Sequence, residues 1–244
     1  MIFKIPYETP EKRNFFLELK VGENNLLKYF KPNEKPPLAD LKEAFIKAIE
    51  SPIDSPKLSE ILYGAKNVTI ITENQFRQAP IKEILPVLID KIKSFGAEIS
   101  IIIGCGKVPP LSKTEIANKL GKDVVNADVE ICCNDVNHVE NYVLKGITTA
   151  GTPLWVHHKV TEADVVITIG TVQATLWGYG GSGMIIPAVA SNETIEINHI
   201  MSLAPDCIPG NNNCMMQIDK YESARLVGID MGINMIVNNR FEVS

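Results

Sequence analysis

The chain has 244 residues, a length that favours one large domain, and its 45% hydrophobic and 22% charged residues are typical of a globular protein with a sizeable core. Its 24 Lys and Arg against 29 Asp and Glu give a net charge of -5, which argues against general binding to nucleic acid or to an anionic membrane surface. No apolar run is long enough to cross a bilayer and the first residues lack the layout of a signal peptide, so we expect a cytoplasmic protein.

Cysteine usage gives no sign of a disulfide framework or of a zinc site. The number of cysteines is odd, no pair has the Cys-x-x-Cys spacing, and no histidine stands in zinc-finger register with them. We therefore expect free, buried thiols at Cys105, Cys132, Cys133, Cys207 and Cys214.

The first fifty residues predict a hairpin, a loop and a helix. Residues 1–22 alternate apolar and polar side chains, which is typical of an edge hairpin, and residues 31–37 (KPNEKPP) are typical of a linker loop. From residue 38 the apolar positions follow a helical period, and the helix should end at Ser51 because Pro52 disfavours helical backbone before it. The buried face of this helix should hold Leu41, Ala44, Phe45 and Ala48.

Three short runs rich in β-branched residues follow, at 67–72, 97–103 and 163–169. Each run is nearly all apolar, a pattern typical of strands that are buried on both faces of a sheet. Residues 81–95 predict a helix that Gly96 closes, so the first two strands and this helix form a right-handed βαβ unit. Parallel pairing is the expected consequence.

The remaining elements complete an α/β pattern. A helix over 112–120 should begin with a capping box made by Ser112 and Glu115. Further expected elements are helices over 192–200 and 218–227 and strands over 129–133 and 234–237. We predict a single domain over residues 1–244 with an open, mainly parallel, Rossmann-like sheet and helices on both faces.

Ligands of open parallel sheets bind at the carboxyl ends of the strands, so the segments after the strands are the candidate sites. After the first strand, Arg77 can hold a carboxylate or phosphate through two hydrogen bonds, or can simply pair with a surface glutamate. After the second strand, Gly106 permits a close backbone approach and Lys107 supplies positive charge. Pro109 and Pro110 stand where a dinucleotide fingerprint needs its third glycine, which disfavours a nicotinamide cofactor.

A glycine-rich loop follows the third strand. Residues 178–183 contain four glycines, and the backbone amides of Gly180, Gly181, Ser182 and Gly183 can form an anion nest or a purely structural turn. The loop lacks the Lys-Ser/Thr ending of a P-loop, so triphosphate hydrolysis has no support. The residues alone single out no metal ligand among the four histidines, and His199 is typical of a cation in a last helical turn.

Several longer stretches carry specific motifs. They are Ser51-Pro52-Ile53 with Ser55-Pro56, Arg77 with Pro80, residues 146–156, residues 162–170 with the glycine-rich loop, residues 186–190, and Glu193-Thr194-Ile195 up to Asn198-His199. Together these stretches resemble the N-terminal domain of the nickel-dependent lactate racemase family, from about residue 36 onward.

The resemblance implies a cytosolic racemase or epimerase of 2-hydroxy acids. It implies a nickel pincer cofactor, built on a pyridinium ring and held covalently by a lysine, that passes a hydride. The resemblance assigns nickel ligation to His199 and the substrate carboxylate to Arg77. Two further histidines of the family exchange the substrate hydroxyl proton.

The chain departs from the family at the residues that carry the chemistry. Val108 and Thr175 stand where the two proton-transferring histidines are expected, and neither is an effective base near neutral pH. No lysine occurs between Lys159 and Lys220, so covalent attachment of the cofactor is not expected. The family also has a C-terminal domain, so we expect either a truncated chain or a one-domain relative ending at Ser244.

We therefore expect a divergent member of this superfamily with weakened or altered catalysis. Two alternatives stay open: a non-catalytic module that binds a small carboxylate or phosphate, and a subunit that completes a site with a partner chain or a second copy. In each case the ligand is expected at Arg77, Gly106 and Lys107, beside the glycine-rich loop.

Overall fold

The computed structural model describes residues 1–6, 15–30, 33, 35–77, 79–181, 184–238 and 242–244. The chain divides into two compact units, Met1–Lys35 and Pro36–Ser244. No helix within these described ranges is both long and apolar enough to span a membrane.

The first unit is a two-stranded hairpin. Strand β1 (Ile2–Pro6) pairs antiparallel with β2 (Phe16–Lys20), which confirms the predicted hairpin, and a short 3-10 turn, η1 (Glu23–Asn25), follows. None of the side chains whose exposure is described in this unit is buried. The described part of the predicted linker, residues 33 and 35–37, forms neither helix nor strand.

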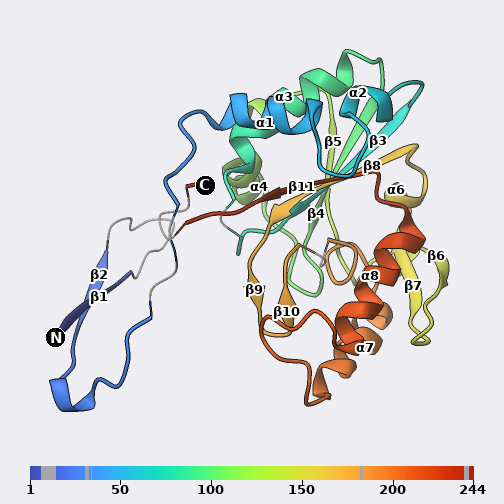
Figure 1. Cartoon of the computed structure of the whole chain (residues 1–244). Coiled ribbons are helices and arrows are strands. Elements are labelled where there is room, and N and C mark those ends of the chain that lie inside the picture. The colour runs from blue at the N-terminus through green and yellow to red at the C-terminus, as the bar shows by residue number, and fades with distance from the viewer. Residues whose placement is uncertain (7–14, 31–32, 34, 78, 182–183, 239–241) are drawn as a thin grey trace. The chain divides into compact units, whose positions relative to one another are not determined.

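The second unit is built on a five-stranded sheet (Figure 1). The strand order is β11-β8-β3-β4-β5, and every neighbouring pair is parallel. The strands are β3 (Asn67–Glu73), β4 (Glu98–Gly104), β5 (Glu130–Cys133), β8 (Val165–Thr171) and β11 (Met231–Met235). The predicted parallel sheet is thereby confirmed.

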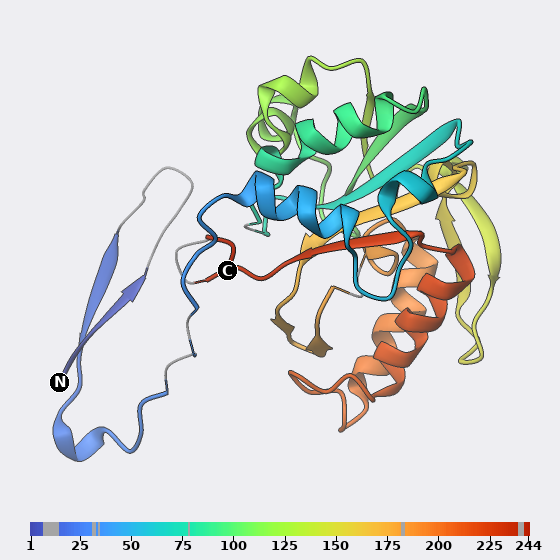
Figure 2. The same cartoon turned by 45° about the horizontal axis from the view of Figure 1, so that its top comes forward.

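The three central strands are buried on both faces because their side chains alternate between two cores. Ile70, Ile101 and Ile167 face one core with the helices α1 (Leu41–Glu50) and α3 (Ile81–Lys93), and their neighbours Ile71 and Ile102 face the other. Figures 1 and 2 show α1 and α3 on one side of the sheet, and α7 (Asn192–Ile200) and α8 (Met215–Val227) on the other. Helices on both faces, as predicted, explain why these strands read as nearly continuous apolar runs.

Most predicted helices form, with small shifts at their ends. The helices are α1 (Leu41–Glu50), α2 (Leu58–Ile61), α3 (Ile81–Lys93), α4 (Lys113–Leu120), α5 (Lys122–Val125), α6 (His158–Thr161), α7 (Asn192–Ile200) and α8 (Met215–Val227), with 3-10 turns η2 (Val139–Asn141) and η4 (Met201–Leu203). Ser112 and Glu115 form the predicted capping box. One predicted position is wrong: Ala48 is exposed, and the buried stripe of α1 passes from Phe45 to Ile49, one full turn on.

Two antiparallel pairs were not predicted. Strands β6 (Tyr142–Ile147) and β7 (Pro153–His157) form a hairpin, and β9 (Ala174–Thr175) pairs with β10 (Gly178–Tyr179) after the third central strand. The last strand of the sheet also begins at Met231, three residues before the predicted start, and ends at Met235.

Candidate functional site

A cavity of about 350 Å³ lies at the carboxyl ends of three central strands. Glu73, Gly104 and Thr171 are the last residues of β3, β4 and β8, and all three line it. The position agrees with the general rule for ligands of open parallel sheets. The volume is sufficient for a small organic acid.

Glu73, the acidic residue that the described part of the chain contributes to the cavity wall, is already paired. Glu73 is 6% exposed, and its carboxylate accepts hydrogen bonds from Lys119 Nζ at 3.1 Å and from the Thr171 hydroxyl at 2.6 Å. The backbone amides of Thr171 and Ala79 also donate to it, at 3.0 and 3.3 Å. With these donors in place, Glu73 fixes the ends of β3 and β8 to each other and is not a free base.

Arg77 lines this cavity from the loop that follows β3. Its backbone is held by Asn74, whose carbonyl accepts from the Arg77 amide at 3.3 Å, and by Lys119, whose Nζ donates to the Arg77 carbonyl at 2.8 Å. Within the described ranges, no carboxylate forms an ion pair with the Arg77 guanidinium. The structure therefore shows no surface glutamate paired with Arg77 among the residues that it describes.

Gly106 and Lys107 also line the cavity but differ in how available they are. Gly106 adopts φ 56°, and a Cβ there would lie 3.2 Å from Pro187 Cβ, so glycine is required both by conformation and by close packing. The Lys107 ammonium pairs with Glu196 at 2.7 Å, and about half of each side chain is exposed. This surface ion pair offsets much of the positive charge that the sequence assigned to Lys107.

The glycine-rich loop enters the cavity wall at Gly180 and Gly181. A Cβ on Gly181 would lie 2.6 Å from the Asn234 side-chain oxygen, so the backbone runs close to β11 there. The predicted nest residues Ser182 and Gly183 lie outside the described residues. The loop is anchored on its other side by the Gly210 amide, which donates to the Gly178 carbonyl at 3.1 Å.

His199 contributes an imidazole to the cavity wall from the last turn of α7, as predicted. Its ring meets the Trp177 indole edge-on, with centroids 5.3 Å apart, and its Nδ1 is buried without a hydrogen-bond partner in the described chain. Burial, with the positive charge of Lys220, lowers the pKa of His199 to about 4. The ring is therefore neutral at physiological pH.

Sequence reasoning missed Lys220, which lines the same cavity from α8. Its side chain is 6% exposed, and it forms no ion pair or hydrogen bond with the described residues. A signal was present in the sequence: Met216, Asp219, Lys220 and Ser223 share one face of a helix by their spacing, and all four are buried. A lysine on the buried face of a helix is unusual enough to mark a site.

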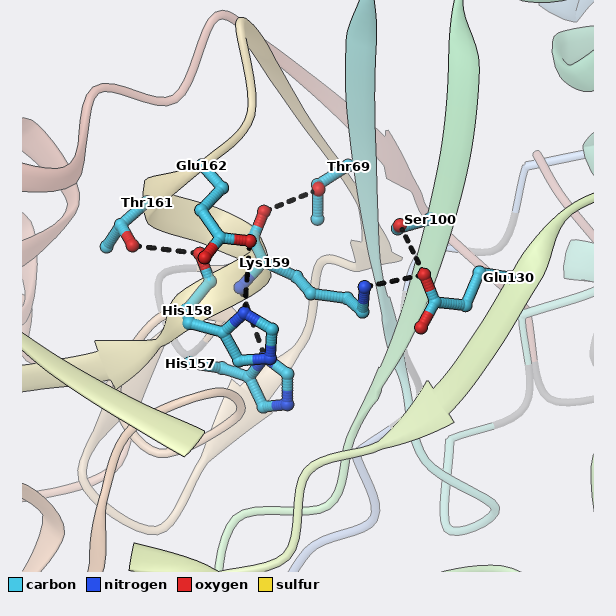
Figure 3. Close-up of polar contacts among 8 residues, drawn as sticks. All are labelled: Thr69, Ser100, Glu130, His157, His158, Lys159, Thr161 and Glu162. Atoms are coloured by element: carbon cyan, nitrogen blue, oxygen red, sulfur yellow. Dashed lines mark hydrogen bonds and ion pairs between the residues drawn. The ribbon is translucent and has the colours of Figure 1, made fainter. Parts of the chain in front are cut away.

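His157 and His158 belong to a different edge of the sheet from His199 (Figure 3). His157 is 3% exposed and stacks on His158 with centroids 4.9 Å apart, next to Lys159, which pairs with Glu130 at 2.5 Å. Lys159 and Glu130 line a second cavity with the first residues of β3 and β4, at the amino ends of the strands. Burial lowers the pKa of His157 to about 4, helped by the positive charges of His158 and Lys159.

Comparison with known proteins decides the family. The family model of the lactate racemase N-terminal domain matches residues 13–207, most of the chain. The chain belongs to the lactate racemase N-terminal domain family. Curated lactate racemases of Lactiplantibacillus plantarum and Thermoanaerobacterium thermosaccharolyticum are each 31% identical to it, over 65% and 63% of this chain.

Solved structures show the same fold. The lactate racemase apoprotein of Thermoanaerobacterium thermosaccharolyticum superposes with a TM-score of 0.86 at 23% identity, covering 100% of this chain and 57% of that one. A protein from Thermotoga maritima gives a TM-score of 0.67 at 18% identity, covering 83% of this chain and 51% of that one. The sequence matches span only 38% and 37% of the two curated racemases, so the chain corresponds to a part of their length.

The lactate racemase family implies a nickel pincer cofactor tethered by a lysine of the glycine-rich loop, and this chain has no lysine there. The lysines that line the cavity, Lys107 and Lys220, belong to other segments, so the residues present do not fit that tether. The glycine-rich loop offers no amine, and Cys105, the thiol in the cavity wall, has its pKa raised by a hydrogen bond with Cys133 and by burial. His199 supplies a neutral imidazole. In the part of the chain that the structure describes, no three His, Cys, Asp or Glu residues gather around a possible metal position.

The two departures from the family also line this cavity. Val108 and Thr175 both contribute to its wall, at the positions where the family resemblance places imidazoles. The Thr175 hydroxyl donates to the Gly178 carbonyl at 3.3 Å, and valine has no group that can move a proton. Among the described residues, the cavity thus combines two cations without an ion-pair partner, Arg77 and Lys220, with one neutral imidazole.

Proposed function

We propose that this chain binds a small 2-hydroxy or 2-oxo carboxylate in the cavity at the carboxyl ends of the strands. The observation that carries the proposal is the pair of cations Arg77 and Lys220, which line one small cavity without a carboxylate partner in the described chain. A buried cation without a counter-ion is costly, and an anionic ligand supplies the missing charge. A planar guanidinium suits a carboxylate in particular, because it can donate two parallel hydrogen bonds.

The ligand class is taken from the relatives together with the cavity. Both curated relatives are named lactate racemases, and lactate is a 2-hydroxy acid whose size suits a cavity of about 350 Å³. Altered catalysis follows from Val108 and Thr175, because neither can exchange the substrate proton as an imidazole would. We therefore propose that the chain is a divergent relative of the racemases that keeps the acid-binding site and has lost the family's proton transfers.

Calorimetric titration of the full chain with D-lactate, L-lactate, pyruvate and inorganic phosphate tests this proposal. Arg77→Ala should weaken the binding of the carboxylates by roughly 10- to 100-fold, the loss of about 1.5 to 3 kcal/mol expected for a charged hydrogen bond. Arg77→Lys should restore only part, because an ammonium cannot make the two-point contact. If neither substitution changes the affinity for the carboxylates, the ligand binds at another site.

A second candidate function, a subunit that completes its site with a partner, is favoured by apolar side chains beside the cavity. Phe76 and Leu176 are 66% and 71% exposed, and each is the chain neighbour of a residue that lines the cavity, Arg77 and Thr175 respectively. Exposed apolar groups around a binding site are typical of a docking surface. Size-exclusion chromatography with light scattering separates the two cases, since a self-sufficient binding module elutes as a monomer that binds ligand.

A further inference from the structure

The Lys220 side chain differs from that of Lys119, which lies at the same edge of the sheet. The Lys119 side chain is 9% exposed, and its ammonium pairs with Glu73 at 3.1 Å and donates to the Arg77 carbonyl at 2.8 Å. Lys220 lines the cavity and has neither kind of partner in the described chain. A buried amine without a counter-ion loses its proton more easily than an amine in an ion pair, and the neutral amine is a nucleophile.

The adjacent carboxylate does not serve Lys220 as a counter-ion. Asp219 accepts hydrogen bonds from the Thr148 hydroxyl at 2.5 Å, from the Thr152 hydroxyl at 3.0 Å and from the Asn198 amide at 2.7 Å. These three donors satisfy the Asp219 carboxylate, and it forms no ion pair with Lys220 among the described residues. Lys220 therefore lines the cavity without a directly bonded carboxylate.

Burial and charge both favour a reactive state of this amine. Burial lowers the pKa of Lys220 to about 8, and Arg77 adds to the lowering, while Cys207, Cys214 and Asp219 oppose it. About one amine in ten is then neutral at pH 7, against roughly one in a thousand for an ordinary lysine. A desolvated lysine beside another cation is the usual form of a lysine that attacks carbonyl groups.

We propose that Lys220 forms an imine with a 2-oxo acid whose carboxylate is held by Arg77. The inference rests on the proposed function, since the same cavity binds the acid. A 2-oxo acid has its carbonyl carbon next to its carboxylate, so an acid held by Arg77 presents that carbon within the cavity that Lys220 lines.

The chemistry needs no further reactant. The Lys220 nitrogen attacks the carbonyl carbon and a C–N bond forms. Both hydrogens of the neutral amine pass to the former carbonyl oxygen, the second by exchange with solvent, and this oxygen departs as water while the C–N double bond forms. The product is the imine, and addition of water reverses the reaction, so atoms and electrons balance without an oxidant or reductant. A 2-hydroxy acid has no carbonyl group and can only occupy the cavity.

Reductive trapping tests the imine. The full chain is incubated with pyruvate and sodium cyanoborohydride, and the product is examined by intact-mass spectrometry and peptide mapping. We expect a single 1-carboxyethyl group, located on Lys220, and we expect excess lactate to slow its formation. Arg77→Ala should reduce the rate of labelling at low pyruvate by about tenfold, the effect of losing a charged hydrogen bond.

Two variants make the result specific. Lys220→Arg keeps a positive charge but cannot form an imine, so it should bind lactate and remain unlabelled. Lys91→Arg is the matched control, because Lys91 is a partly exposed lysine that pairs with Glu50 at 2.8 Å away from the cavity, and this variant should label as the parent does. Labelling that persists in Lys220→Arg, or that spreads over surface lysines, would overturn the inference.

The same experiment separates failure of the imine from failure of the proposed function. Arg77-dependent binding of lactate without labelling of Lys220 rejects the imine and leaves the proposed function standing. Absence of both binding and labelling rejects the two together.

Discussion

At the scale of single residues, the cavity is defined by an imbalance of charge among buried groups. Lys119 and Glu73 neutralise each other, with side chains 9% and 6% exposed. Lys220 is as deeply buried as this pair and has no such partner in the described chain. Because desolvation penalises the charged form of a lysine, the folded state carries a cost at Lys220 that a ligand or a substitution can relieve.

Replacing Lys220 should therefore stabilise the protein, and the gain should depend on pH. The pKa of Lys220 is lowered to about 8 in the folded chain and is near 10.4 in the unfolded chain, so the unfolded chain binds more protons between those values. The stability of the parent should then rise as pH rises through that window. At pH 7, Lys220→Met should be more stable by roughly 2 to 3 kcal/mol, and the difference should vanish near pH 10 to 11.

Urea denaturation of parent and variant at pH 7, 9 and 10.5 measures this difference. Lys119→Met is the matched control: it removes a lysine of similar burial but strands the Glu73 carboxylate, so it should destabilise the protein at pH 7. A Lys220→Met variant that is less stable than the parent at pH 7 would mean that the amine has a partner in solution.

At the scale of elements, α8 is positioned by one buried carboxylate. Asp219 connects it to the turn between β6 and β7 through Thr148 and Thr152, and to α7 through Asn198. The same helix presents Lys220 to the cavity, and α7 presents His199. The network therefore sets the relative position of two of the cavity's functional groups.

Removal of this carboxylate should be far more damaging than removal of an exposed one on the same helix. Asp219→Ala leaves three buried donors unpaired and should lower the free energy of unfolding by roughly 3 kcal/mol. Glu222 lies one turn nearer the carboxyl end of α8 and accepts from the Thr149 amide and hydroxyl at 2.9 and 2.7 Å in an exposed position. Glu222→Ala should cost about 1 kcal/mol or less. Equal losses in urea denaturation would contradict the role assigned to the buried network.

Local sequence patterns predicted the elements that bury a regular set of apolar side chains. The central strands and α3 form where apolar periodicity placed them, because each buries a continuous face of the sheet or a regular stripe of a helix. Helix α8 was predicted from Ile218 and begins at Met215, since its buried face is polar at Gln217, Asp219 and Lys220 and carries a weak apolar signal. The β6–β7 hairpin was missed because Val143, Leu144 and Ile147 are exposed and break the expected alternation.

The candidate site was predictable in part for the same reason. Arg77, Gly106, Lys107, Gly180, Gly181 and His199 all follow strands or end a helix, and the structure brings them to one cavity. Their roles in binding remain predictions. Spacing alone groups Lys220 with other residues on one face of α8, but only the packing of α8 against α7 and the β6–β7 turn shows that its side chain lines the cavity without a counter-ion among the described residues.

At the scale of the whole molecule, the net charge is -5, but the two edges of the sheet differ in the sign of the charge that they carry. The carboxyl edge of the sheet gathers the cations Arg77 and Lys220, while Lys107 is paired with Glu196 and Lys119 with Glu73. The cavity at the amino edge is lined by four acidic residues against two lysines: Glu98, Asp128, Glu130 and Glu162, with Lys93 and Lys159. An anion entering from solvent is therefore drawn to the carboxyl edge and repelled from the other, although the protein as a whole is acidic.

We expect the second compact unit to fold and bind its ligand without the first. The five-stranded sheet, both of its apolar cores and every residue assigned to the cavity belong to Pro36–Ser244. The unit Met1–Lys35 has a hairpin with no buried side chain among those described, and an isolated hairpin of this kind contributes little stability of its own. A chain that begins at Pro36 should therefore fold with a urea midpoint close to that of the parent and should bind lactate with unchanged affinity. Circular dichroism during urea denaturation and calorimetric titration of the shortened chain measure both quantities. A large fall in the midpoint, with the lactate affinity lost as well, would show that the hairpin covers part of the sheet unit, and the assignment of the cavity to Pro36–Ser244 alone would then be wrong.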